Sequence, residues 1–322
     1  MLKRPLLALL LAFCAAVAAH AQTFPARPVK ILVPFPPGGG IDVLVRAMAA
    51  ELSPKWGQAV VIENRPGAGG NIGAELVARA EPDGHTLLAT VNQTFTSNRY
   101  LYKALPFDPD RSFLPVTLMV QGDHFLLANP ALAAKDVREL VALAKAQPGK
   151  LTFGSFGSGS QPHLVYVTLN KREGLDLLHV PYKGIAPLLA ALVAGEVNLG
   201  TGSAGVAGQL IKAGRVKALA VAGKQRAAQF PDVPTTAEAG YPYLLASIWF
   251  GLFAPAGTPA AVIDRVSGDA RALLKTSAFA EKHVTSKGLE VVASTPAELA
   301  AAIREESVSV GEMIRAANVQ AE

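Results

Sequence analysis

The alternation of strand-like and helix-like segments is the feature that most constrains how this chain can fold. Val29–Val33 is a run rich in β-branched residues, and Asp42–Leu52 and Val137–Ala146 carry apolar residues at helical spacing. Such alternation is typical of α/β proteins, so we predict an α/β fold. A strand, a glycine-rich loop and a helix follow one another at 29–52 and again at 151–169. Further strands are predicted at 60–62, 86–91, 125–128, 177–180, 216–221 and 248–254, and further helices at 72–80, 186–194 and 260–275.

The first residues carry the pattern of a secretory signal peptide. Lys3 and Arg4 give a positive start, Leu6–Ala19 is a short apolar run, and Ala19-His20-Ala21 matches a cleavage signal. The run is shorter than the roughly 20 apolar residues that a membrane-spanning helix needs. We expect residues 1–21 to be removed after Ala21 and the mature protein to lie in the periplasm. The alternative is an uncleaved anchor.

Composition limits the chemistry of the mature chain. The only cysteine, Cys14, lies in the predicted signal peptide, so the mature chain has no disulfide, thiol nucleophile or cysteine-based zinc site. The formal charge of +5 falls by two, to +3, when Lys3 and Arg4 are removed. This mild basicity favours an anionic ligand weakly, and without any Lys/Arg run we expect no nucleic-acid partner. The remaining chain of about 300 residues suffices for one large domain or two of ordinary size.

A proline- and glycine-rich loop, Pro34–Gly40, separates the first strand from the first helix. Glycines let the backbone approach a ligand closely, and free N–H groups before a helix N-terminus attract an anion together with the helix dipole. The alternative is an ordinary strand-to-helix turn. Asp42, in the first helical turn, is either a favourable charge at this end of the helix or an acceptor for a ligand. The predicted ligand contacts in the loop are Phe35, Pro37, Gly38, Gly39 and Gly40.

A second glycine-rich loop, Gly154–Ser160, adds hydroxyl groups to the glycines. Its serines can donate hydrogen bonds to carboxylate oxygens directly or through water. Ser160 could instead cap the following helix. His163, one turn into that helix, is a further candidate contact, with packing or capping as the alternative. The predicted contacts in this loop are Gly154, Ser155, Gly157, Ser158, Gly159 and Ser160.

The sequence contains no arrangement of residues typical of an enzyme. Gly67–Gly73 is similar to a dinucleotide-binding fingerprint, but Ile72 stands where the third glycine is needed. Motifs of the Gly-x-Ser-x-Gly, His-Glu-x-x-His and P-loop types are missing, and the six histidines lack metal-ligand spacing. We therefore expect no catalytic residues, no metal and no cofactor. A competing hypothesis, a hydrolase or isomerase, would rest on Ser158 and His163 without a third orienting residue.

An ordered set of short motifs along the mature chain resembles a known family. Individually short, they are specific as a set. The chain resembles the tripartite tricarboxylate transporter receptors, also called the Bug family of periplasmic solute-binding proteins, over essentially its whole mature length. The motifs are Pro34-Phe35-Pro36-Pro37-Gly38-Gly39-Gly40 with Asp42, Glu63-Asn64-Arg65-Pro66-Gly67-Ala68-Gly69-Gly70-Asn71-Ile72-Gly73, Pro82-Asp83-Gly84, Val180-Pro181-Tyr182-Lys183-Gly184, Pro231-Asp232-Val233-Pro234-Thr235 and Ala254-Pro255-Ala256-Gly257-Thr258-Pro259.

The resemblance implies a two-lobed Venus-flytrap fold, similar to the type II periplasmic binding proteins, with the ligand in a cleft between α/β lobes joined by crossing strands. We expect residues 22–122 and 246–322 to form lobe 1 and residues 123–245 to form lobe 2. The two glycine-rich loops would face each other and hold a small carboxylate, partly through water. The implied protein is a receptor, not an enzyme, that serves two membrane permease subunits, and we expect it to be a monomer. Presentation of the ligand to a membrane kinase is the alternative.

Several positions depart from the residues usual in the family. Ile41 stands in place of a hydroxyl residue, Gln93 in place of a small residue, and Thr201-Gly202 in place of a Phe-Asp pair. We expect segment 200–205 to be a small, flexible loop and the cleft to suit a bulkier or more highly charged carboxylate than a small amino acid. For the aromatic candidates Tyr182 and Trp249, core packing is the alternative. The remaining predicted ligand contacts are Asn92, Tyr182, Thr201 and Ser203.

Overall fold

The computed structural model describes residues 24–157, 159–316 and 319 of the 322-residue chain. The predicted signal peptide with its cleavage site after Ala21, and the candidate ligand contact Ser158, lie outside the described residues. Within these ranges, no helix combines the length and the apolar character that crossing a membrane requires. The same ranges hold no cluster of three or more His, Cys, Asp or Glu side chains suited to a metal ion.

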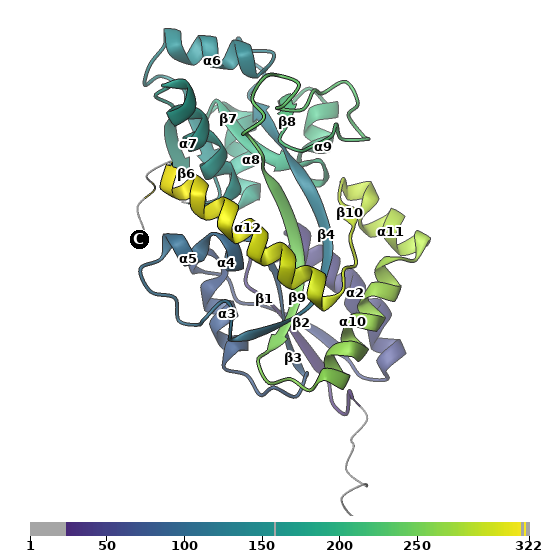
Figure 1. The fold of residues 1–322 in the computed structure, drawn as a ribbon. Coiled ribbons are helices and arrows are strands. Elements are labelled where there is room, and N and C mark those ends of the chain that lie inside the picture. Colours follow the sequence, from purple (N-terminus) through teal and green to yellow (C-terminus); the bar gives the residue numbers. More distant parts are fainter. Residues whose placement is uncertain (1–23, 158, 317–318, 320–322) are drawn as a thin grey trace, which may run out of the picture.

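The lower half of the molecule in Figure 1, which we call lobe 1, is built on a mixed sheet. Its strands are β1 (Val29–Val33), β2 (Val60–Asn64), β3 (Thr86–Val91), β9 (Ser247–Pro255), the first part of β4 (Phe113–Ala128) and the short β10 (Glu290–Val291). β1 pairs in parallel with β2 and β3, whereas β9 is antiparallel to both β3 and β4. Two helices, α2 (Gly40–Trp56) and α10 (Ala260–Leu274), cover one face, and α3 (Asn71–Ala78) and α12 (Pro296–Ala316) cover the other.

The upper half in Figure 1, which we call lobe 2, repeats this layered arrangement. Its strands are the last part of β4, β5 (Thr152–Ser155), β6 (Leu178–Pro181), β7 (Leu199–Ser203) and β8 (Lys217–Val221). β5 is parallel to β6 and β7, whereas β4 is antiparallel to β7 and β8. The helices α6 (Val137–Ala146) and α7 (Gln161–Glu173) share one core with the sheet, and α8 (Ile185–Ala194) and α9 (Ala204–Lys212) share another.

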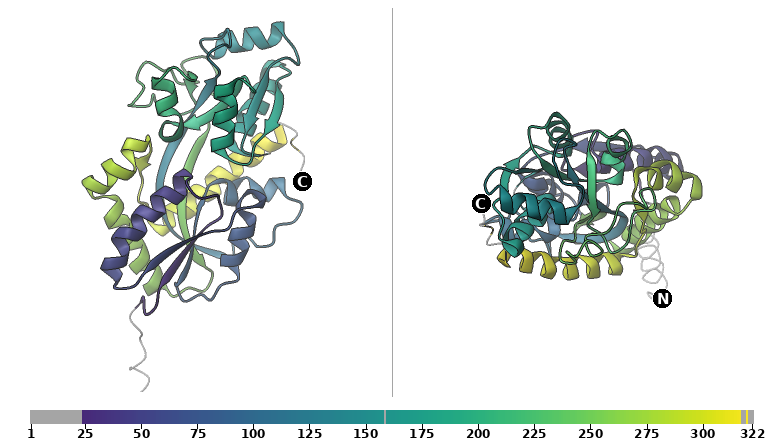
Figure 2. Two further views of the ribbon diagram at one scale, coloured as in Figure 1. Left: turned by 180° about the vertical axis from the view of Figure 1, so that it is seen from behind. Right: turned by 90° about the horizontal axis from the view of Figure 1, so that it is seen from above.

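Two long strands join the lobes, as Figures 1 and 2 show. β4 pairs with β9 as far as Asp123 opposite Ser247, and from His124 onward it pairs with β7 instead. Separate hydrophobic cores lie on either side of this crossing. The prediction of a two-lobed α/β fold is therefore confirmed.

The last long helix, α12, contacts both lobes. It runs diagonally across the molecule in Figure 1 and packs on β4, on the short helix α4 (Gln93–Thr96) and on α7. Val310 and Ile314 share a small hydrophobic cluster with Leu101 of α5 (Asn98–Leu101) and Leu164 of α7. The chain between α10 and α12 forms α11 (Ser277–His283) and a 3-10 turn at Thr285–Lys287.

Local sequence signals account for several element ends. Asp136 accepts the Glu139 N–H at 2.8 Å and caps α6, as expected for an aspartate at this position. Gly195 ends α8 with φ +80°, a left-handed conformation that glycine adopts readily. The predicted helix at 137–146 is confirmed by α6, and the predicted helix at 186–194 differs from α8 by one residue.

One prediction about local structure is too short and another is wrong. Residues 125–128 are a strand, as predicted, but they are only the end of β4, which begins twelve residues earlier at Phe113. Segment 200–205 is not a flexible loop, because Gly200–Ser203 belong to β7 and α9 begins at Ala204. β7 lies between β4 and β5, where hydrogen bonds from neighbouring strands hold even a glycine-rich segment extended.

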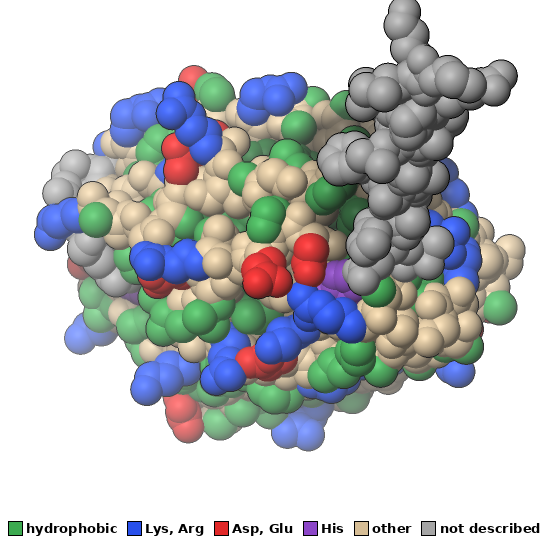
Figure 3. Space-filling view, turned by 90° about the horizontal axis from the view of Figure 1, so that it is seen from below, with side chains coloured by type: hydrophobic (Ala, Val, Ile, Leu, Met, Phe, Trp, Pro, Cys, Tyr) green, Lys and Arg blue, Asp and Glu red, His purple; other side chains and the backbone are tan. Residues whose placement is uncertain are grey.

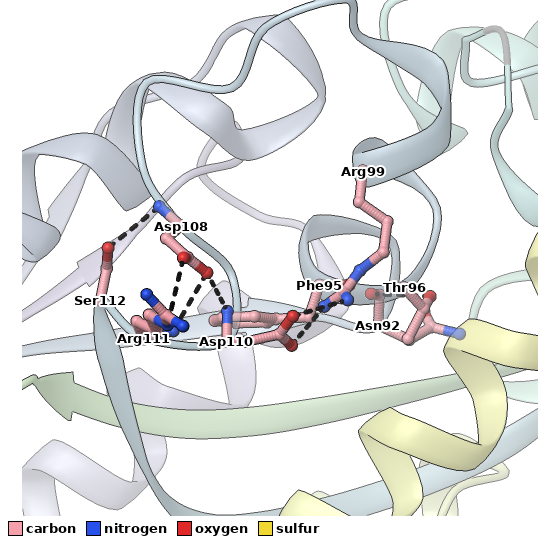
Figure 4. Close-up of polar contacts among 8 residues, drawn as sticks. All are labelled: Asn92, Phe95, Thr96, Arg99, Asp108, Asp110, Arg111 and Ser112. Atoms are coloured by element: carbon pink, nitrogen blue, oxygen red, sulfur yellow. Dashed lines mark hydrogen bonds and ion pairs between the residues drawn. The ribbon is translucent and has the colours of Figure 1, made fainter.

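The connection between α5 and β4 is held by ion pairs on lobe 1. Arg99 donates two hydrogen bonds to Asp110, at 2.9 and 3.0 Å, and a third to the carbonyl oxygen of Phe95 (Figure 4). Elsewhere, acidic and basic side chains are interspersed over the face of lobe 1 shown in Figure 3.

Candidate functional site

The first glycine-rich loop connects β1 with α2 and leaves the N-terminus of this helix uncapped by side chains. Gly38 adopts φ +82°, and Gly39 is the N-cap of α2 in an extended conformation. The first N–H groups of a helix have no partner within it, so here they can serve an anion. α2 directs this end toward lobe 2 (Figure 2). Pro37, Gly38 and Gly40 are exposed, and Phe35 and Gly39 are half-buried.

Asp42 holds this loop in place. The side chain is buried, and its Oδ2 accepts the Gly38 N–H at 2.9 Å while Oδ1 accepts the Asn64 amide at 2.9 Å. Arg46 Nε lies 3.0 Å from both oxygens. Burial alone would raise the pKa of Asp42, but these hydrogen bonds outweigh it and hold the pKa below its usual value. Protein donors thus occupy both oxygens, which favours the interpretation of Asp42 as a charge at the helix N-terminus over that of a ligand acceptor.

The second glycine-rich loop connects β5 with α7 and is organised by its own serines. Ser155 and Ser160 are fully buried. Ser155 Oγ lies 2.7 Å from His179 Nε2 and accepts the Gly157 N–H at 3.1 Å. Ser160 Oγ donates to the carbonyl oxygen of Gly157 at 2.6 Å and makes no cap bond, so the capping alternative for Ser160 is wrong. Gly157 has φ +127° and open space where a Cβ would stand, so this residue is reachable by a ligand.

His163 supports the same loop from the first turns of α7. Its Nδ1 accepts the Gly159 N–H at 2.9 Å, and its ring centroid lies 4.3 Å from that of His179. Burial, and then the neighbouring His179, lower the pKa of His163 to about 4. The imidazole is therefore neutral at physiological pH, with Nδ1 already used. This arrangement fits the packing alternative for His163 better than a catalytic base.

The second loop also contacts lobe 1 directly. A Cβ at Gly159 would lie only 1.8 Å from Leu101 Cδ1, so only glycine fits here. In a second interlobe contact, a Cβ at Gly205 in α9 would lie 2.0 Å from the Lys287 carbonyl oxygen. The lobes therefore touch at these points as well as where α12 packs on α7. Gly154, at the start of this loop, lies beside the ring of half-buried Tyr182. A Cβ added at Gly154 would lie 3.3 Å from that ring.

Asn92 lies where the end of β3 meets β9 and α12. Its amide donates to the Ser247 carbonyl oxygen at 3.1 Å and to Glu306 Oε1 at 2.7 Å. Trp249 also donates its indole N–H to Glu306, so its ring is a core residue of lobe 1 rather than a free aromatic surface. Figure 4 shows Asn92 beside α12. Sequence reasoning missed Glu306, because nothing in an isolated helix distinguishes a glutamate that becomes buried.

Thr201 and Ser203 project from β7 on the face that also carries His124. In the β4–β7 register His124 is opposite Ser203, and His124 Nδ1 lies 3.1 Å from Thr201 Oγ1. Thr201 is fully buried and Ser203 nearly so. The contribution of His124 is visible only in the fold, since the sequence shows it merely as one of six scattered histidines.

The fold and these loops define a class of protein, the two-lobed periplasmic binding proteins. The sequence model of the tripartite tricarboxylate transporter family receptor matches residues 44–319. The chain therefore belongs to this receptor family, as the motifs indicated. Members of the family are solute-binding receptors rather than enzymes.

Named relatives agree with this assignment. Protein BugT of Bordetella pertussis is 35% identical over 275 residues, which are 85% of this chain and 84% of BugT. Among solved structures, R. palustris Rpa4515 with adipate matches with a TM-score of 0.88 and 31% identity, covering 93% of this chain and 100% of that one. MatC (Rpa3494) from Rhodopseudomonas palustris with bound malate matches with a TM-score of 0.83 and 34% identity. This match covers 90% of this chain and 100% of that one.

Proposed function

We propose that the protein is a periplasmic receptor that captures a small carboxylate in the cleft between its lobes and delivers it to the membrane subunits of a tripartite tricarboxylate transporter. The observation that carries this proposal is the pair of glycine-rich loops. Each follows a strand, and each leads into a helix, α2 or α7, whose N-terminus no side chain caps. One loop belongs to each lobe, so closure would bring two sets of backbone donors onto one anion.

The ligand class follows from the donors. Backbone N–H groups and helix N-termini bind acceptor oxygens and favour negative charge. The relatives whose structures hold adipate and malate support a dicarboxylate. We propose that the contacts come from Phe35, Pro37–Gly40 and Gly157–Gly159. In this proposal Asp42, Ser155, Ser160 and His163 position the loops, and Gly154 and Tyr182 back the second one.

The closure motion would occur where β4 and β9 cross between the lobes. We propose lobe bounds of 22–122 with 246–322 and 123–245, since the β4–β9 pairing ends at Asp123 opposite Ser247. The same proposal includes export with cleavage after Ala21 and a monomeric mature protein. The transporter would recognise the closed form.

Recovery of the natural ligand tests the proposal most directly. Mature protein 22–322 is purified from the periplasm without a carboxylate buffer, denatured, and its supernatant analysed by mass spectrometry. We expect a di- or tricarboxylate in near-equal ratio to protein, which rebinds unchanged and raises the melting temperature. Recovery of a chemically altered product after incubation, or of a non-acidic ligand, would contradict the proposal.

A further inference from the structure

His124 occupies the point where β4 enters lobe 2. Asp123 is the last residue of β4 paired with β9, and His124 is the first paired with β7. The residue is 2% exposed. Its ring centroid lies 6.4 Å from that of Phe156, which belongs to the second glycine-rich loop. His124 therefore lies at the end of lobe 2 that carries this loop and the N-cap of α9, Ser203.

The two ring nitrogens of His124 have different surroundings. Nδ1 lies 3.1 Å from the hydroxyl of Thr201. Nε2 is fully buried and has no hydrogen-bond partner among the described residues. Buried polar atoms nearly always have a partner in the protein or in bound solvent or ligand. An unpaired ring nitrogen beside a candidate binding loop therefore points to a partner outside the described residues, such as a bound ligand.

The protonation state of the ring identifies what that partner must be. Burial lowers the pKa of His124 to about 4, so the ring is neutral at physiological pH and carries one N–H. When the fully buried Thr201 hydroxyl donates to Nδ1, the ring proton lies on Nε2. Nε2 is then a donor that requires an acceptor oxygen.

We propose that His124 Nε2–H donates a hydrogen bond to a carboxylate oxygen of the ligand, and that Thr201 holds the ring in the tautomer this requires. The inference rests on the proposed function and sharpens it. A neutral N–H donor accepts no hydrogen bond, so the site disfavours a ligand with an ammonium group at this position. It therefore selects malate-like dicarboxylates over the corresponding amino acid, aspartate.

Binding measurements on matched variants test this assignment. We would titrate malate, adipate, citrate and aspartate into wild-type protein, His124→Phe, Thr201→Val and the control His283→Phe by calorimetry. His283 lies on α11 in lobe 1, against Phe279. We expect His124→Phe to weaken the best of these ligands by about tenfold or more, the scale of one hydrogen bond to a charged group. Thr201→Val should have a smaller effect, and His283→Phe none.

A second readout reports the tautomer without any ligand. Nitrogen-15 spectra of the imidazoles should show that His124 is protonated at Nε2 in wild-type protein. The chemical shift of this Nε2 proton should change when the ligand binds. Wild-type affinity in His124→Phe, or protonation at Nδ1, would overturn the assignment and leave the proposed function standing. Failure of wild-type protein to bind any of the four probes would overturn both. Unchanged melting temperature in His124→Phe excludes misfolding as the cause of lost binding.

Discussion

Asn92 donates its amide N–H to Glu306 at 2.7 Å, and this bond ties the end of β3 to the long helix α12. The two residues are 214 positions apart in the sequence. The Glu306 carboxylate also receives hydrogen bonds from Trp249 of lobe 1 and from Gln161 at the start of α7 in lobe 2. One buried carboxylate therefore joins α12 to both lobes.

Replacing Glu306 by glutamine should destabilise the protein. Glutamine offers only one acceptor oxygen. Its own N–H groups would face donors whose hydrogen bonds the carboxylate accepts in the wild-type protein, including Trp249 Nε1. We expect a loss of about 2 kcal/mol in the free energy of unfolding, measured by urea denaturation. The matched control is Glu305→Gln on the exposed side of the same helix, which should change stability little. Equal effects of the two substitutions would refute the role of Glu306.

Removing the charge of Asp42 should loosen the first loop. Asp42→Asn loses an ionised acceptor for Gly38 and Arg46, and we expect a cost of about 2 kcal/mol and weaker carboxylate binding. The folded pKa of Asp42 is lowered, so its stabilisation is present above pH ~3.8, its usual pKa. It is lost as pH falls through the lower folded pKa. Denaturation of Asp42→Asn against the exposed control Asp264→Asn, from pH 2 to 7, checks both points.

Gly159→Ala should separate the lobes. The new Cβ would stand 1.8 Å from Leu101 Cδ1 at φ +71°, so the loop must move away from lobe 1. We expect a larger radius of gyration by X-ray scattering and weaker ligand binding. Gly174→Ala, at the C-terminal end of α7, is the control, because it also has a positive φ but no neighbour within 4 Å and lies outside the proposed ligand contacts. The double variant Gly159→Ala/Leu101→Ala should recover compactness, and a double variant no more compact than Gly159→Ala would argue against this contact.

His163 should make stability depend on pH between about 4 and 6.5. The folded pKa is lowered to about 4, so in this range the unfolded chain binds more protons than the folded one. The contribution of His163 to the free energy of unfolding is therefore fully present above pH 6.5, near the pKa of this residue in the unfolded chain. It declines as pH falls toward 4, by about 3 kcal/mol in all. The difference in unfolding free energy between wild-type protein and His163→Gln, measured across this range, should follow that curve. A constant difference would contradict the neutral state of His163.

Gly39→Val should abolish carboxylate binding without unfolding the protein. Gly39 has an ordinary φ of −70°, and a Cβ would meet only the Pro36 carbonyl oxygen, at 3.6 Å. The fold therefore tolerates a side chain, but this side chain would stand at the N-terminus of α2, where the ligand oxygens are proposed to lie. Unchanged affinity for malate or adipate, measured by calorimetry, would refute the loop assignment.

The sequence by itself determined the structural features that depend on residues close together in the chain. The apolar spacing predicts α6 to the residue, and the strand–loop–helix pattern locates both candidate loops. The ordered motifs also identify the receptor family. These features act over a few residues, where propensity, capping and turn geometry dominate.

Only the tertiary structure decided which polar side chains bond within the loops and which pair across long stretches of the chain. Ser155 and Ser160 looked like ligand donors, but they bond within their own loop and to His179. His124 meets Thr201 across 77 residues, and Asn92 meets Glu306 across 214. Such pairs form through strand register and the packing of α12 on both lobes, and burial then decides protonation. No local pattern in the sequence encodes either relationship.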